Sequence, residues 1–411
     1  MPHKHAFVLL LLIVLGVALG LLSGWYFGEG MREIAWIGQL FLNALKMMII
    51  PLIIAAVISG VSSMGDIRKL GRVGGITLGY YVLTTGIAVF IGLVMVNLIE
   101  PGVGLHIASG DVAAAQAKVA GKEGIGISDI ILSLVSSNLV ASAAETQLLP
   151  IILWSILFAA ALTTLGKRGE PTLRFFEGMN EAMMKLVIWL MYFAPIGIFA
   201  LVAGRLGQAG GGAAFFQEIQ AVGWHVVTVL SALAVHFVIL YLILHFVARR
   251  GREYLVGMLR ALFTAFGTAS SSATLPLTME CARENKIDDR AVEFTLPLGS
   301  TVNMDGTALY EAAAVMFIAQ AYGIDMSFGQ QAIIFVTATL AAIGAAGIPE
   351  AGLVTMVIVL GAVGLPLDGI GLLLAVDWFL DRFRTTTNVW GDSVGAAVVH
   401  RFITRDSQPS Q

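Results

Sequence analysis

Long apolar runs follow one another along the N-terminal part of the chain and predict membrane-spanning helices. Runs long enough for a span of about 20 residues cover 6–26, 34–61, 75–98, 148–165, 186–202 and 221–247. A shorter run at 130–140 is typical of one part of a broken fourth helix. Lys and Arg cluster in alternate loops, at 68–72 and 249–252 for example. The positive-inside rule therefore predicts that both termini are cytoplasmic.

The pattern changes after residue 250. Two mostly apolar arms, 254–266 and 332–346, end in small, helix-averse residues at 267–276 and 344–352. Arms of this length fit re-entrant hairpins better than full crossings, and non-helical tips are tolerated at membrane depth only where they line a cavity. Each hairpin precedes a helix with polar residues at its middle, so the two units indicate an inverted repeat around a transport site. An ordinary helical kink is the alternative for either tip.

Polar and charged residues form a stripe on the last predicted helix. At about 100° per residue, these residues fall within an arc of roughly 100°: Asp377, Asp381, Arg384, Thr385, Asn388 and Asp392. A charge at bilayer depth costs about 2.5–3.5 kcal/mol even on a lenient scale. Several such charges on one face indicate a water-accessible site for a charged ligand. Structural ion pairs between packed helices are the alternative.

A second polar segment, 296–311, lies between the two hairpins. Its Asn303-Met304-Asp305-Gly306-Thr307 sequence disfavours a continuous helix. An unwound turn here would free carbonyl groups near Gly299 and Asn303 to bind a hard cation together with carboxylates. The carboxylates are scattered among hydroxyl and carbonyl groups, which favours Na⁺ over a divalent ion.

Composition agrees with a membrane protein. Of the 411 residues 57% are hydrophobic and 12% charged, with a net charge of −3, whereas soluble proteins carry about 25% charged residues. The absence of a basic excess argues against a nucleic-acid partner. A membrane hydrolase would need a base near Ser270, Ser271 or Ser272, and no histidine lies nearby in sequence. We therefore expect no enzyme activity.

Three motifs resemble those of one transporter family. Ser270-Ser-Ser-Ala-Thr-Leu-Pro276, Asn303-Met-Asp-Gly-Thr307 and Asp381-Arg-Phe-Arg-Thr-Thr-Thr-Asn388-Val-Trp-Gly-Asp392 are similar to motifs of the glutamate/aspartate–cation symporters, the dicarboxylate/amino-acid:cation symporter family. The sequences of these motifs are most similar to those of its excitatory amino-acid transporter branch. Order and spacing fit across the whole chain, most tightly from about Gly251 to Arg401.

The resemblance implies an all-α integral membrane protein with eight transmembrane helices, two re-entrant helical hairpins and an elevator mechanism. It implies a scaffold at 1–70 (helices 1 and 2) and 101–210 (helices 4 and 5). The transport domain would comprise 71–100 (helix 3) and 211–405 (helix 6, hairpin 1, helix 7, hairpin 2 and helix 8). Residues 406–411 would form a disordered tail. The assembly would be a homotrimer in the plasma (inner) membrane.

Carried over residue by residue, the resemblance implies a substrate site. Arg384 would pair with the substrate's side-chain carboxylate, and Asp381 would take its ammonium group. Asn388, Thr385 and the Ser271–Ser272 region would hold the α-carboxylate, with Thr307 nearby. Gly347, Ile348 and Gly352 would form the lid of the second hairpin.

The resemblance also implies about three Na⁺ sites. One would use Gly299, Asn303, Asn388 and Asp392. Another would use Tyr81, Thr84, Thr85, Asn303 and Asp305. A third would use Thr301 with carbonyl groups near Ala342, Ile343 and Ala345.

Three positions bear on finer questions. Ala269 stands where some prokaryotic members carry an arginine, and Arg382 on the last helix would replace its charge. Glu311 would be a proton carrier, neutral while the site is loaded, although a structural glutamate fits nearly as well. Glu350 stands at the second tip, where relatives often have Gly or Gln, and nothing in the sequence explains it.

The sequence thus predicts a secondary active symporter that moves L-glutamate or L-aspartate into the cell with Na⁺. Co-transport of H⁺ through Glu311 and counter-transport of K⁺ remain open. A C4-dicarboxylate or a neutral amino acid is the alternative substrate. A C4-dicarboxylate would leave Asp381 without an ammonium partner, and relatives for neutral amino acids lack the arginine at position 384.

Overall fold

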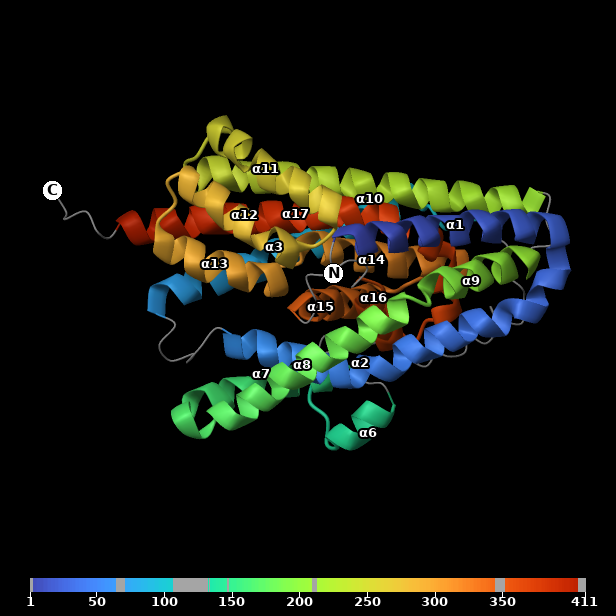
Figure 1. Cartoon of the computed structure of the whole chain (residues 1–411), viewed down its shortest axis with the longest axis horizontal. Helices are drawn as coiled ribbons and strands as arrows, with labels where there is room; N and C mark the ends of the chain where they lie inside the picture. The colour runs from blue at the N-terminus through green and yellow to red at the C-terminus, as the bar shows by residue number, and fades with distance from the viewer. Residues whose placement is uncertain are drawn as a thin grey trace.

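The computed structural model describes residues 3–63, 71–105, 132, 134–145, 148–208, 213–343 and 352–405. Throughout these ranges the regular elements are helices, and no strand occurs in them. The expected all-α class is therefore confirmed. The helices run mostly along the long axis of the molecule, and α17 reaches one end of it (Figure 1).

The first group of helices comes from the N-terminal half. It contains α1 (His3–Phe27), η1 (Gly28–Ile34), α2 (Ala35–Ser63), α6 (Leu139–Ala144), α7 (Leu148–Thr164), η3 (Gly166–Arg168), α8 (Glu170–Met191) and α9 (Ala194–Gln208). Within this group α1 packs on α9, and α2 packs on α7, α8 and α9.

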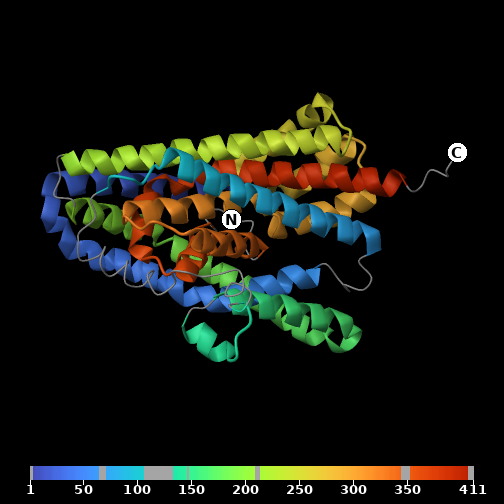
Figure 2. The ribbon, with the colours of Figure 1, turned by 180° about the vertical axis from the view of Figure 1, so that it is seen from behind.

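The second group combines α3 (Gly71–Ile99) with the C-terminal half. It contains α10 (Ala213–Phe246), α11 (Arg252–Thr268), α12 (Ser271–Glu284), α13 (Asp289–Val302), α14 (Asp305–Ala321), α15 (Phe328–Ile343), α16 (Gly352–Val363), η4 (Leu367–Gly369) and α17 (Ile370–Arg405). Figure 1 shows α10, α11, α12 and α17 along one side, with α2, α7 and α8 along the other. From behind, α3 lies across α14 and α17 (Figure 2), both of which it contacts.

Two of the described helices are long and apolar enough to cross a membrane by length and composition, Val73–Ile99 and Ile219–Phe246. A third span arises if Glu170–Leu190 and Ala194–Gly204 form one bent crossing. The apolar run at 186–202 does not form one straight helix, because the chain bends by 56° between these two helices. Pro195 lies at the start of α9 and has no N–H to continue the hydrogen-bond ladder of α8.

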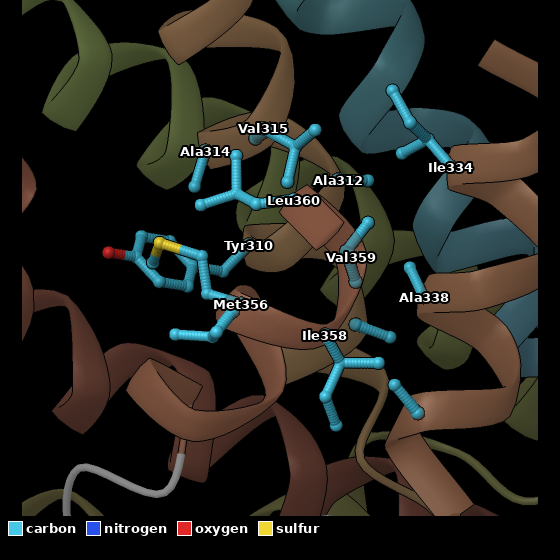
Figure 3. Packing of buried hydrophobic residues seen from close by; sticks show 14 of the residues in the cluster. Tyr310, Ala312, Ala314, Val315, Ile334, Ala338, Met356, Ile358, Val359 and Leu360 are labelled. Atoms are coloured by element: carbon cyan, nitrogen blue, oxygen red, sulfur yellow. The ribbon is translucent and has the colours of Figure 1, made fainter. Parts of the chain in front are cut away.

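The core surrounds α14, whose residues are buried from Asp305 to Ala319 and again at Ala321. Apolar side chains of α14, α15 and α16 interlock there, among them Val315, Ile334, Ala338 and Val359 (Figure 3). Such a helix is buried on every side and shows no amphipathic pattern. It fixes the position of the polar residues at its own N-terminus.

The two expected hairpins correspond to pairs of packed helices. Helices α11 and α12 contact each other and are joined through Ala269, which has a left-handed backbone (φ 48°, ψ 35°). Ser270 then caps α12 by accepting a hydrogen bond from the Ala273 N–H. Helices α15 and α16 form the second pair. Its expected tip, with Gly347, Ile348 and Glu350, lies outside the described residues.

Candidate functional site

The helical backbone breaks between α13 and α14, as the sequence predicts. Asn303 (φ −104°, ψ 81°) and Met304 (φ −107°, ψ 57°) leave the helical region, and α14 begins at Asp305. Backbone groups near such a break have no intrahelical partners and are available to ligands. The break is therefore the backbone half of a polar centre inside the second helix group.

A guanidinium between two carboxylates forms the first half of the site. Arg384 is fully buried, and its Nη1 and Nη2 atoms each lie 2.9 Å from a carboxylate oxygen, of Asp377 and Asp381 respectively. The ring of Tyr310 lies 4.0 Å from the Arg384 guanidinium carbon, a cation–π contact. Two acids and one base leave this centre with an excess negative charge, which an ammonium group would balance. The guanidinium itself presents a planar fork suited to a carboxylate.

Two glycines allow the backbone to approach Arg384. A Cβ atom at Gly352, the first residue of α16, would lie 2.9 Å from Arg384 Nη1. At Gly306 it would lie 2.5 Å from the Arg384 carbonyl oxygen. Any side chain at either position would displace α17 or the guanidinium. The start of α16 thus lies against the guanidinium, and the first turn of α14 lies against the α17 backbone at Arg384.

Asn388 links this centre to the helix break. Its Oδ1 atom accepts a hydrogen bond from the Gly306 N–H at 2.7 Å, and its Nδ2 atom donates to the Thr307 hydroxyl at 3.2 Å. Thr385, one turn away, is buried. Ser271 is also buried at the start of α12, whereas Ser272 is exposed.

An oxygen-rich cluster lies on the other side of the break. The Thr85 hydroxyl donates to Asp305 Oδ1 at 2.8 Å, and the Thr84 hydroxyl lies 3.4 Å from both Asp305 Oδ1 and Asn303 Oδ1. Asn303 Nδ2 donates to Asp392 Oδ1 at 3.0 Å. Carboxylate, amide and hydroxyl oxygens of this kind are ligands for hard cations. The donor set fits Na⁺.

Helix α13 approaches the same cluster through Gly299. A Cβ atom there would overlap Asp392 Oδ1 and would lie 2.5 Å from the Tyr81 hydroxyl. Tyr81 donates its own hydrogen bond to the Thr295 carbonyl. The structure therefore brings together α3, the helix break and α17 around Asp305 and Asp392.

The residues expected for a third cation site are placed only in part. Thr301, on α13, donates to the Leu298 carbonyl at 3.1 Å. Ala342 and Ile343 end α15, which contacts α13. Ala345 lies outside the described residues.

One buried histidine, His236 on α10, is not among the site residues expected from the sequence. Its Nε2 atom lies 3.0 Å from Asp305 Oδ2, and both side chains are fully buried. Because Asp305 Oδ1 faces Thr84 and Thr85, the histidine fixes the orientation of the carboxylate from the opposite side. Helical spacing could not indicate this contact, because His236 and Asp305 lie on different helices, 69 residues apart. The signal in the sequence was a polar side chain, His236, inside the apolar run 221–247.

Two further side chains lie where the sequence suggested. Arg382 Nη1 donates to the Phe266 and Gly267 carbonyls, each at 3.0 Å, so its charge reaches the end of α11 next to Ala269. Glu311 is fully buried on α14, and Thr355 of α16 and the Arg384 guanidinium are the groups that act on its carboxylate.

Comparison with known proteins shows the family of this chain. The profile of the sodium:dicarboxylate symporter family matches residues 9–402, and the chain belongs to this family. It is therefore a membrane transport protein that depends on Na⁺, and not an enzyme.

Its relatives include an "Excitatory amino acid transporter 1" of Ambystoma tigrinum, 38% identical over 98% of this chain and 84% of the relative. An "Excitatory amino acid transporter" of Caenorhabditis elegans is 37% identical over 97% of this chain and 88% of the relative. The human "Excitatory amino acid transporter 3" is 35% identical, over 95% and 83% respectively.

Proposed function

We propose that this protein is a secondary active symporter that carries L-aspartate or L-glutamate into the cell together with Na⁺. The observation that carries the proposal is the buried Arg384 guanidinium, held at 2.9 Å from both Asp377 and Asp381. A zwitterionic diacid brings one ammonium group and two carboxylates. Its ammonium group can pair with Asp381 and its side-chain carboxylate with Arg384, and the co-transported Na⁺ ions offset the negative charge of the remaining carboxylates, since a buried charge without a partner would cost several kcal/mol.

The substrate exchanges partners with the side chains already present. Its side-chain carboxylate takes the Arg384 fork, and its ammonium group takes Asp381, which the guanidinium then releases. The α-carboxylate accepts hydrogen bonds from Asn388, Thr385 and the start of α12 at Ser271, with Thr307 beside them. Gly352 begins the segment that closes over the substrate, and Ile348 belongs to the same lid.

The cations occupy the oxygen-rich groups around the helix break. Asp392, Asn303 and Asn388 hold one Na⁺ with the Gly299 carbonyl. Asp305, Thr84, Thr85 and Tyr81 hold another with Asn303. Thr301 and the end of α15 hold a third. The hydrogen-bond distances of 2.8–3.4 Å among Thr85, Thr84, Asn303 and Asp305 support the second site most directly.

Transport requires the loaded site to reach both sides of the membrane. The packing into two helix groups supports a scaffold of 1–70 and 101–210 and a moving unit of 71–100 and 211–405, with two re-entrant hairpins among eight spans. The moving unit carries the whole site and shifts like an elevator. The protein acts as a homotrimer in the plasma (inner) membrane, with both termini in the cytoplasm.

Glu311 couples transport to protons. The glutamate is fully buried in α14, beside Thr355 of α16 and the Arg384 guanidinium. Burial of a carboxylate disfavours its charged form. Glu311 therefore picks up a proton with the substrate and releases it on the return step.

Radiolabelled uptake into proteoliposomes tests this proposal. An inward Na⁺ gradient should drive accumulation of L-[³H]aspartate, and its replacement by choline should abolish it. Proton and K⁺ gradients are then imposed one at a time. If succinate and malate compete better than L-glutamate, the substrate is a C4-dicarboxylate. Uptake of L-serine in preference to L-aspartate would also overturn the assignment.

A further inference from the structure

A polar junction at the C-terminal end of the molecule lies far along α17 from the transport site. It joins Arg250, from the link between α10 and α11, to His400 on α17 and to the turn between α12 and α13, residues 285–288. Arg250 Nη2 lies 3.1 Å from His400 Nε2, and the Asp288 N–H donates to His400 Nδ1 at 3.1 Å. We name these residues the clasp.

Arg250 also holds the turn directly. It donates to the carbonyl oxygens of Asn285 at 3.4 Å and Lys286 at 3.3 Å. Lys286 has a left-handed backbone (φ 60°), so the turn is tightly closed. Asn285 packs onto α11, since a Cβ atom at Gly257 would overlap its side-chain amide. The clasp thereby fixes the base of the first hairpin to the helix that carries Arg384 and Asp392.

The two contacts of His400 make conflicting demands on its imidazole ring. Arg250 and the Asp288 N–H can only donate hydrogen bonds, so both ring nitrogens would have to accept. A neutral imidazole has one acceptor nitrogen, and a protonated one has none. The neutral ring therefore satisfies one of the two donors, whereas the charged ring repels both.

Burial lowers the pKa of His400, and the two neighbouring arginines lower it further. Arg250 and Arg401, the latter on α17 itself, bring positive charge close to the ring, whereas Asp288 brings negative charge. The Asp288 carboxylate is already engaged, because it accepts hydrogen bonds from the Arg290 guanidinium at 3.0 and 3.1 Å. This pairing lowers the pKa of Asp288, so its charge persists through the range in which histidine titrates.

We propose that His400 is a positioning residue that locks the base of the first hairpin to α17, and that its protonation opens this lock. If the cytoplasmic placement of the C-terminus holds, acidification of the cytoplasm would slow transport by loosening the unit that carries the site. Because the clasp contacts neither substrate nor cation ligands, the maximal rate should fall while the KM for substrate is unchanged.

His400→Asn tests the proposal. The asparagine Oδ1 can accept the Asp288 N–H as Nδ1 does, but the side chain cannot be protonated. His400→Arg imitates the permanently charged ring. His245→Asn, at an exposed histidine near the end of α10, is the matched control. Uptake into proteoliposomes is measured at an external pH of about 7.5 and internal pH from about 7.5 to about 5, a range that extends below the ordinary titration range of histidine because the pKa of His400 is lowered.

We expect the maximal rate of the wild type and of His245→Asn to fall at least about threefold on internal acidification, as His400 becomes charged. His400→Asn should keep its rate, and His400→Arg should be slow at every pH with an unchanged KM. If His400→Asn shows the same acid response as the wild type, the response comes from another group, such as Glu311, and the proposal is wrong.

The expected effect on transport rate rests on the proposed function. Hydrogen–deuterium exchange does not require transport, so it tests the role of His400 separately from the proposed function. Amides at 285–288, compared with those of α14, should lose protection on acidification in the wild type and not in His400→Asn. Equal protection of these amides at both pH values in the wild type would refute the role proposed for His400, even if aspartate uptake is confirmed.

Discussion

Replacement of Arg384 by cysteine is the most direct test of the substrate assignment. The guanidinium would make two charged hydrogen bonds to a substrate carboxylate, each contributing about 1.5–3 kcal/mol. It gives up existing bonds to Asp377 and Asp381 to do so, so we take the lower end, about 3 kcal/mol in total. A tenfold change in affinity corresponds to about 1.4 kcal/mol. L-Aspartate affinity should therefore fall about 100- to 200-fold in Arg384→Cys, measured by competition uptake and by direct binding.

The same substitution should also destabilise the protein, and this effect must be separated from recognition. Without Arg384 the buried Asp377 carboxylate loses its partner, which costs about 3–5 kcal/mol when one member of a buried pair is removed. The double variant Arg384→Cys/Asp377→Asn removes that unpaired charge. It should recover thermal stability in detergent but should not recover affinity for aspartate.

Arg382→Cys serves as the matched control. Arg382 is two residues away, and its guanidinium binds backbone carbonyls at the end of α11. It should leave the affinity for aspartate within a few-fold of the wild type. L-Serine, which has no side-chain carboxylate, should bind Arg384→Cys at least as well as it binds the wild type. Unchanged aspartate affinity in Arg384→Cys would refute the role we give to the guanidinium.

Three further substitutions test the cation and proton assignments. His236→Phe leaves Asp305 Oδ2 without its partner, and a buried unsatisfied acceptor costs about 1–3 kcal/mol. The Na⁺ concentration for half-maximal uptake should therefore rise about 5- to 150-fold. An unchanged Na⁺ titration would show that the histidine only packs. Gly299→Ala places a methyl group against Asp392 and should weaken Na⁺ binding more than substrate binding at saturating Na⁺, as read from isothermal titration. Glu311→Gln should abolish the effect of an inward proton gradient on uptake, and equal gradient dependence in variant and wild type would exclude Glu311 as the carrier.

Local sequence patterns predicted the positions of most helices and of the break between α13 and α14. The run of Asn303, Asp305 and Gly306 disfavours helix by residue type alone, and the backbone leaves the helical region at Asn303 and Met304. The arms predicted at 254–266 and 332–346 correspond to α11 and α15 within a few residues. These features depend on neighbours in sequence, which is why the sequence reveals them.

Contacts between distant helices could not be foreseen in this way. Asp305 and His236 are 69 residues apart, and Arg250 and His400 are 150 apart. Helical spacing predicted that Asp377 and Arg384 share a face, but not that they pair directly, because their separation of two turns leaves several side-chain conformations open. The bend before Pro195 was missed because hydrophobicity continues across it, although the proline itself was a visible signal.

The first turn of α14 is shared by two kinds of ligand. Asp305 faces the hydroxyls of α3, and the next residue, Gly306, donates its N–H to Asn388 on the substrate side. A cation that orders Asp305 would therefore also set the N–H and hydroxyl groups on which an amino acid depends. Such coupling is reciprocal by thermodynamic necessity. The factor by which Na⁺ raises the affinity for the amino acid is also the factor by which the amino acid raises the affinity for Na⁺. This single turn of backbone can thus make carriers that hold only Na⁺ or only the amino acid rare. That is the condition for the gradient of one solute to drive the transport of the other.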